Sequence, residues 1–137
     1  MSLGISTVNG PLSVITRIKE EGNWPRAVVM LAIYLEKHSY LAVKEHFAPL
    51  KNAVDKRSLE RLHLTHYGLV LLAAGRITPD EYITIRGINK VRNSWMHREE
   101  KKYQIGTKGK REYLPLLEKG EHLLRKLFAP RVCVSKR

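Results

Sequence analysis

Arg92, Asn93 and His97 lie within six residues of one another and have the chemistry to act together on a phosphate group. Arginine stays charged at physiological pH and can hold two phosphate oxygens, whereas histidine titrates near neutrality and can take up or release a proton. Asn93 is placed to orient the imidazole or to bind a substrate. Cleavage of RNA by its own 2′-hydroxyl requires a proton acceptor, a proton donor and a cation. The trio therefore predicts catalysis by these three residues, with no metal and no other cofactor.

The charge of the chain favours a nucleic-acid partner. Lysine and arginine number 25 against 13 aspartate and glutamate residues, so the formal net charge is +12. Such a charge attracts polyanions, and RNA is the expected partner. The segment 101–111 holds two glycines, five basic residues and no acidic residue, which predicts an exposed loop that either contacts RNA or only aids solubility. The residues expected to bind the substrate are Asn89, Arg98, Lys101, Lys102, Tyr103, Lys108 and Lys110.

Length and cysteine content narrow the class of protein. A chain of 137 residues is expected to form one domain. Cys133 is the only cysteine, which excludes an internal disulfide and a cysteine-based zinc site and indicates a reducing, cytoplasmic setting. Glycine, proline and polar residues interrupt the apolar residues near the N-terminus, so we expect neither a signal peptide nor a membrane span.

Apolar residues at helical spacing predict three helices in the first half of the chain. A short leading helix is expected over 11–21 and a long helix over 24–47. Ser58 is a candidate cap for a third helix over 59–74, which Gly75 would end. His63 and His66 lie three apart on this helix; a shared metal is the less favoured interpretation, and we expect His66 to be packed and His63 to lie at an edge.

The second half of the chain predicts two further helices. Thr78 followed by Pro79 is the clearest start signal in the sequence, for a helix that runs through the trio. A last helix is expected over 112–128, ending before Pro130. Strand-like alternation is scarce, so the expected fold is all-α, an antiparallel bundle of four main helices with a short leading helix. The expected organisation is an N-terminal segment over 1–23, the bundle over 24–128 and a basic tail over 129–137.

The helix that carries the trio has two distinct stripes, one expected to pack and one polar. Their members are Thr84, Ile88, Val91 and Trp95 in the first, and Asn89, Asn93 and His97 in the second. Arg92 precedes His97 by five positions, which on a regular helix is about 140° around the axis and about 7.5 Å along it. Either the helix ends near Met96, or two copies of the chain meet about a two-fold axis and share one cleft. We expect the homodimer.

The run RNSWMH resembles the R-N-x-x-x-H form of the arginine-x(4 to 6)-histidine signature of the HEPN superfamily. An apolar segment, HYGLVLLAAGRI, precedes the motif and an amphipathic helix follows it, an order that resembles these small all-α bundles across residues 24–128. The resemblance implies a metal-independent endoribonuclease with Arg92, Asn93 and His97 as active-site residues at a homodimer interface. It also implies a toxin or defence component, for which a protein antitoxin is an expected partner.

Two other functions compete with the ribonuclease. The segment 100–124 resembles the wing and closing helix of winged helix-turn-helix proteins, with 78–96 as the recognition helix. That DNA-binding alternative requires a β-hairpin across Tyr103 to Leu114. The third alternative is an interaction domain whose surface charge serves a protein partner.

Overall fold

The computed structural model describes the backbone of residues 9–50, 53, 55–96 and 107–135. These residues form helices and no strand, so the predicted all-α fold is confirmed. The elements are α1 (Asn9–Glu20), α2 (Trp24–His46), the short 3₁₀ helix η2 (Ala48–Leu50), α3 (Lys56–Glu60), α4 (Leu64–Ala73), α5 (Pro79–Met96) and α6 (Thr107–Ser135).

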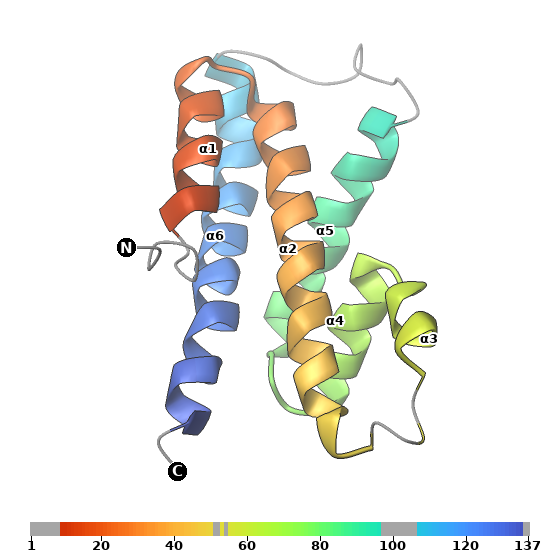
Figure 1. Ribbon diagram of the computed structural model, residues 1–137. Helices are drawn as coiled ribbons and strands as arrows, with labels where there is room; N and C mark the ends of the chain where they lie inside the picture. Colours follow the sequence, from red (N-terminus) through yellow and green to blue (C-terminus); the bar gives the residue numbers. More distant parts are fainter. Residues whose placement is uncertain (1–8, 51–52, 54, 97–106, 136–137) are drawn as a thin grey trace.

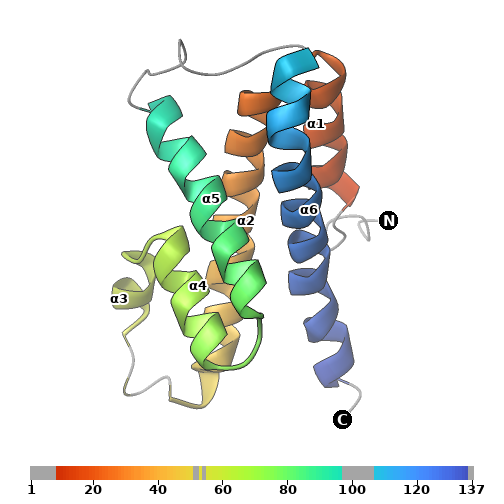
Figure 2. The ribbon, with the colours of Figure 1, turned by 180° about the vertical axis from the view of Figure 1, so that it is seen from behind.

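Helix α2 lies at the centre of the bundle and contacts α1, α4, α5 and α6 (Figure 1). Both views place α1 and α6 on one side of α2, with α4 and α5 on the other and α3 at the outer edge beside α4 (Figure 2). The pairs α1 and α2, α4 and α5, and α5 and α6 run antiparallel, as the sequence predicts. None of the described helices combines the length and the apolar character needed to cross a bilayer.

Helix ends follow local signals in the sequence. Gly22 after α1 and Gly75 after α4 have φ angles of 78° and 74°, a left-handed conformation that glycine adopts without a steric penalty. At the start of α5, Thr78 Oγ1 accepts from the Glu81 N–H at 3.1 Å while Glu81 Oε1 accepts from the Thr78 N–H at 2.8 Å. This reciprocal capping box confirms the predicted start of the helix that carries Arg92.

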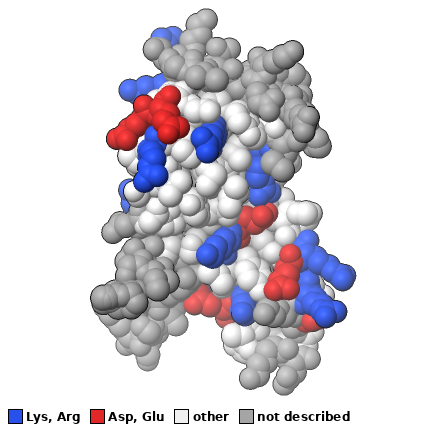
Figure 3. Space-filling model, turned by 45° about the horizontal axis from the view of Figure 1, so that its top comes forward, with Lys and Arg blue, Asp and Glu red and all other residues white. Residues whose placement is uncertain are grey.

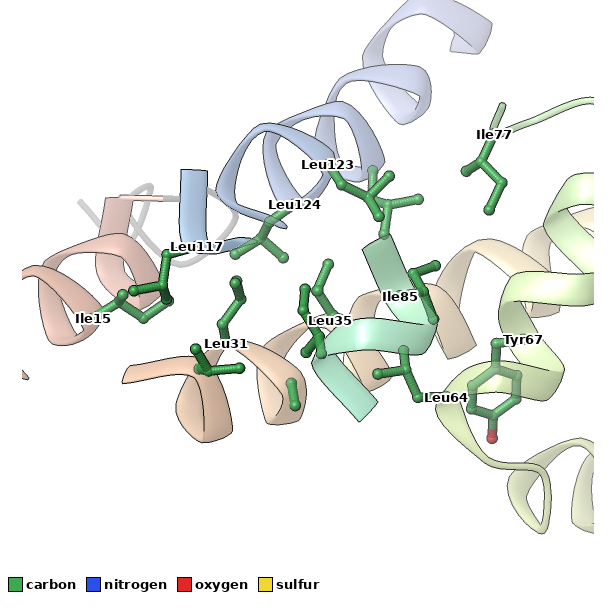
Figure 4. Packing of buried hydrophobic residues seen from close by; sticks show 14 of the residues in the cluster. Ile15, Leu31, Leu35, Leu64, Tyr67, Ile77, Ile85, Leu117, Leu123 and Leu124 are labelled. Carbon is green, nitrogen blue, oxygen red and sulfur yellow. The ribbon is translucent and has the colours of Figure 1, made fainter. Parts of the chain in front are cut away.

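The core extends along the whole bundle (Figure 4). Leu31 and Leu35 of α2 are fully buried between α6 and α5, and full burial of such a side chain contributes about 1.5 to 3 kcal/mol. Helix α1 joins the same core through Ile15 and Ile18. The other labelled core residues are Leu64, Tyr67, Ile77, Ile85, Leu117, Leu123 and Leu124.

The helix predicted over 59–74 is in fact two helices, α3 and α4. Asp55, not Ser58, caps α3, because its side chain accepts from the Arg57 N–H at 3.2 Å. Helix α4 starts afresh at Leu64, whose N–H donates to Glu36 of α2 at 3.0 Å. Tertiary contact with α2 thus sets the start of α4, and apolar spacing along the chain does not reveal it.

Helix α6 is longer than predicted at both ends. It begins at Thr107, so residues 107–111 of the predicted basic loop are helical; residues 101–106 lie outside the described part. It continues past Pro130 to Ser135, so most of the predicted tail is helical too. Proline has a φ angle that fits a helix, so its missing N–H and its ring disfavour a helix interior without excluding it. Since 107–114 is helical, the β-hairpin required by the winged-helix alternative does not form there.

Candidate functional site

Arg92 lies near the end of α5, on a helix held in place by its apolar stripe. Ile88 is fully buried and Thr84 nearly so, while Val91 and Trp95 are half-buried. The stripe therefore packs as the sequence predicts. The end of α5 and the beginning of α6 lie at the same end of the bundle as the start of α2 (Figure 1).

The guanidinium of Arg92 is held by two oxygens through one nitrogen. Nη2 donates to Asn89 Oδ1 at 2.8 Å, one turn back on α5, and to Glu36 Oε2 at 3.2 Å on the neighbouring helix α2. The Arg92 side chain retains 15% of its exposure, so the charge is largely withdrawn from solvent. This candidate catalytic residue is thus oriented by its own helix and by the central helix of the bundle.

Glu36 is the residue of the site that the sequence did not reveal. Its Oε2 accepts both from Arg92 and from the Leu64 N–H at the start of α4. A carboxylate at a helix N-terminus is favoured by the unpaired N–H groups and by the helix dipole. Glu36 precedes Arg92 by 56 residues, and only the fold brings them together.

The two asparagines of the polar stripe have different surroundings. Asn93 is exposed, as a residue that contacts substrate should be. Asn89, predicted to bind substrate, is half-buried and its amide oxygen accepts from Arg92. In this arrangement Asn89 orients the guanidinium; a contact from Asn89 to substrate stays a prediction.

The remaining predicted site residues lie on or near the connection between α5 and α6. Five of them fall outside the described residues: His97, Arg98, Lys101, Lys102 and Tyr103. The backbone of Lys108 belongs to α6, and the Lys110 side chain, two residues further on, is exposed. A hollow of about 300 Å³ lies beside Lys110 and Arg111 and is bounded by Leu114 and Glu118.

Basic side chains do not form one continuous patch on the face that Figure 3 brings forward. Among the residues coloured there, lysine and arginine alternate with acidic and uncharged ones. On the described part of this face, positive charge is therefore not concentrated in one patch, and local geometry must supply specificity for phosphate.

A second hollow of about 500 Å³ lies between the start of α5 and the middle of α6. The ionisable residues that line it are Asp80, Glu81, Glu118, Lys119 and His122, with the exposed Ile83 at one side. It lies about 18 Å along α5 from Arg92, given 1.5 Å per helical residue. Three carboxylates and one lysine line it, and it lies away from Arg92, so we assign it no part in the candidate site.

The histidine pair at the start of α4 has a structural role. His66 Nδ1 accepts from the His63 N–H at 3.1 Å, which supplies a capping contact at the first turn of α4. Both side chains are exposed, so the prediction that His66 is packed is wrong. Within the described residues, no group of three or more His, Cys, Asp and Glu is arranged to hold a metal ion.

No family model, curated protein or solved structure matches this chain. The resemblance to the HEPN superfamily therefore rests on the RNSWMH run and its helical context. Contacts around Arg92 provide the remaining basis for a functional proposal.

Proposed function

We propose that this chain is a metal-independent endoribonuclease of HEPN type that works as a cytoplasmic homodimer. The observation that carries the proposal is the Arg92 guanidinium, held by Glu36 and Asn89 near the end of α5, with the exposed Asn93 as the next residue of the helix. A cation oriented in advance is what stabilisation of a phosphoryl transition state requires.

In the proposed reaction the ribose 2′-oxygen attacks the adjacent phosphorus. The O2′–P bond forms, the P–O5′ bond breaks, and the products carry a 2′,3′-cyclic phosphate and a 5′-hydroxyl. His97 either takes the proton from the 2′-hydroxyl or gives one to the leaving 5′-oxygen. Arg92 binds the oxygens on which negative charge accumulates, and Asn93 orients the imidazole or the substrate.

A second copy of the chain completes the proposed site. A His97 that continued α5 would point about 140° away from Arg92 around the helix axis. A two-fold axis can bring the arginine of one protomer to the histidine of its partner. An RNase of this kind needs an inhibitor in its own cell, which is why a toxin with a protein antitoxin is the proposed setting.

RNA digestion in the presence of EDTA tests this function. The unmodified protein should cut single-stranded RNA and leave 2′,3′-cyclic phosphate ends. His97→Ala and Arg92→Ala should each reduce cleavage at least about a hundredfold, the usual scale for one acid–base or electrostatic group. Lys90→Ala is the matched control, because it removes an exposed cation two residues from Arg92. Undiminished cleavage by His97→Ala would remove the histidine from the mechanism.

A further inference from the structure

Glu36 and Asn89, the partners of Arg92 among the described residues, both accept from the same nitrogen, Nη2. A guanidinium has five N–H donors, two of them on Nη2. It can hold a phosphate by two bonds in two ways, side-on through Nε and Nη2 or end-on through Nη1 and Nη2. Each of these arrangements uses Nη2. With Glu36 and Asn89 both on Nη2, neither two-bond arrangement can form.

We propose that Glu36 is a positioning residue for Arg92 that competes with the RNA phosphate for Nη2. The inference rests on the proposed function, since it concerns the phosphate that Arg92 would bind there. In the arrangement with Glu36 in place, the guanidinium is oriented but offers phosphate only single bonds. Binding of RNA with two bonds requires Glu36 or Asn89 to release Nη2.

Glu36, not Asn89, is the partner that competes. Its carboxylate offsets the charge that attracts phosphate, whereas Asn89 is neutral and sits on the same helix as Arg92. The Leu64 N–H holds the same carboxylate oxygen at 3.0 Å, so Glu36 keeps its position when Arg92 moves. Its side chain is 34% exposed, and solvent therefore reaches the contact that phosphate must replace.

Glu36→Gln separates the charge from the geometry. Glutamine has nearly the same shape and can still accept from Leu64 and Arg92, but it carries no charge. Binding of a short single-stranded 2′-O-methyl RNA, which cannot be cleaved, is measured by fluorescence anisotropy. We expect Glu36→Gln to lower the Kd about threefold to tenfold, the scale of one partly exposed ionic contact. Glu45→Gln, the same charge change on the same helix, should lower it less than twofold.

An Arg92→Ala background shows whether the effect passes through Arg92. In that background Glu36→Gln should improve binding no more than Glu45→Gln does. With cleavable RNA, Glu36→Gln should lower KM by the same factor and leave kcat within about twofold. A role confined to stability would instead lower the melting temperature and leave Kd and KM unchanged, and that result overturns the inference.

The two proposals can fail separately. The unmodified protein could fail to cut RNA while Glu36→Gln still binds the oligonucleotide more tightly through Arg92. In that case the proposed ribonuclease function is wrong, and the proposed competition between Glu36 and phosphate is supported. If the unmodified protein cuts RNA but Glu36→Gln does not bind the oligonucleotide more tightly, the ribonuclease proposal is supported and the proposed competition is wrong. Should Glu36→Gln fail to fold, the Nε–H NMR signal of Arg92 in the unmodified protein decides. A shift on saturation with the oligonucleotide supports the competition, and no shift overturns it.

Discussion

Lys126 on α6 donates from Nζ to Glu81 Oε1 on α5 at 2.8 Å, although 45 residues separate them in the sequence. The same oxygen accepts from the Thr78 N–H, so one carboxylate closes the first turn of α5 and joins that helix to α6. Partial burial alone would raise the pKa of Glu81, but the hydrogen bonds from Lys126 and Thr78 outweigh it and the pKa is lowered.

Acid should therefore destabilise the protein in part through Glu81. A lowered pKa in the folded state means that the carboxylate stabilises the fold above about pH 4.3, the ordinary value for glutamate, and that this contribution is lost as the pH falls through the lowered pKa. Glu81→Gln keeps an acceptor for the cap and should cost about 0.5 to 1 kcal/mol at pH 7. Urea unfolding at pH 7 and pH 3 measures the difference, which should shrink at the lower pH.

Glu20→Gln is the matched control for that experiment. Glu20 is an exposed residue at the end of α1, and its loss should change the free energy of unfolding by less than about 0.5 kcal/mol at either pH. A penalty for Glu81→Gln that is the same at pH 3 as at pH 7 would show that the charge of Glu81 is not what stabilises the fold.

Tyr67→Phe should destabilise the junction of α3 and α4. The buried Tyr67 hydroxyl donates to the Leu59 carbonyl at 2.7 Å, and its loss leaves that carbonyl without this donor at a cost of about 1 to 2 kcal/mol. Burial, and next the negative charge of Glu36, raise the pKa of Tyr67. The neutral hydroxyl is thus favoured, and its contribution should disappear as the pH rises through the raised pKa.

Thermal unfolding between pH 8 and pH 11 checks the tyrosine prediction. The unmodified protein should lose more stability on alkalinisation than Tyr67→Phe does. Tyr34→Phe alters a half-buried tyrosine on α2 and serves as the control. Parallel losses in all three proteins would contradict the role assigned to Tyr67.

Gly120→Ala should weaken the contact of α6 with α2 and α5. A methyl group added at Gly120 would lie 2.7 Å from Ile88 Cδ1 and nearer still to Leu31 Cδ2, and both side chains are fully buried. Overpacking destabilises a fold by about 1 to 3 kcal/mol, and the higher helix propensity of alanine offsets up to about 1 kcal/mol of this loss. We expect a net loss of about 1 to 2 kcal/mol by denaturant unfolding. Gly10→Ala has open space around it and should cost nothing.

The pair of Arg92 and Glu36 should show coupling in stability as well as in binding. Arg92→Ala takes one hydrogen-bond donor from Glu36, and Glu36→Ala removes an acceptor from both Arg92 and Leu64. A double-mutant cycle in urea should give a coupling of about 0.5 to 1.5 kcal/mol. Additivity within about 0.3 kcal/mol would mean that the contact does not persist in solution.

Long periodic segments made most of the fold predictable. Helices α2 and α5 begin at prolines or caps and carry regular apolar stripes, so these local signals locate both helices in the sequence. The break between α3 and α4 escaped prediction because Leu59 and Leu62 continue the apolar spacing across it, while a contact from α2 starts the new helix. The end of α6 was misplaced at Pro130, since proline disfavours a helix interior without excluding it, and α6 continues through Pro130 to Ser135.

Only half of the arrangement around Arg92 could be predicted. Its position on α5 and the packing of the neighbouring stripe follow from helical periodicity. Glu36 stands in a long helix with nothing nearby in sequence to mark it, and its pairing depends on how α2 crosses α5. Asn89 was predicted to contact substrate because it shares a stripe with Asn93, whereas side-chain reach allows it to contact Arg92 one turn away.

One carboxylate oxygen of Glu36 accepts hydrogen bonds both from the Leu64 N–H, the first of α4, and from the Arg92 guanidinium on α5. Fraying of α4 at its first turn would leave that oxygen to Arg92 alone, and departure of Arg92 would leave it to the backbone. Amide hydrogen exchange at Leu64 therefore reports on the state of the guanidinium from a position on another helix. Slower exchange at Leu64 when phosphate occupies Arg92 would reveal the competition without any enzymatic assay.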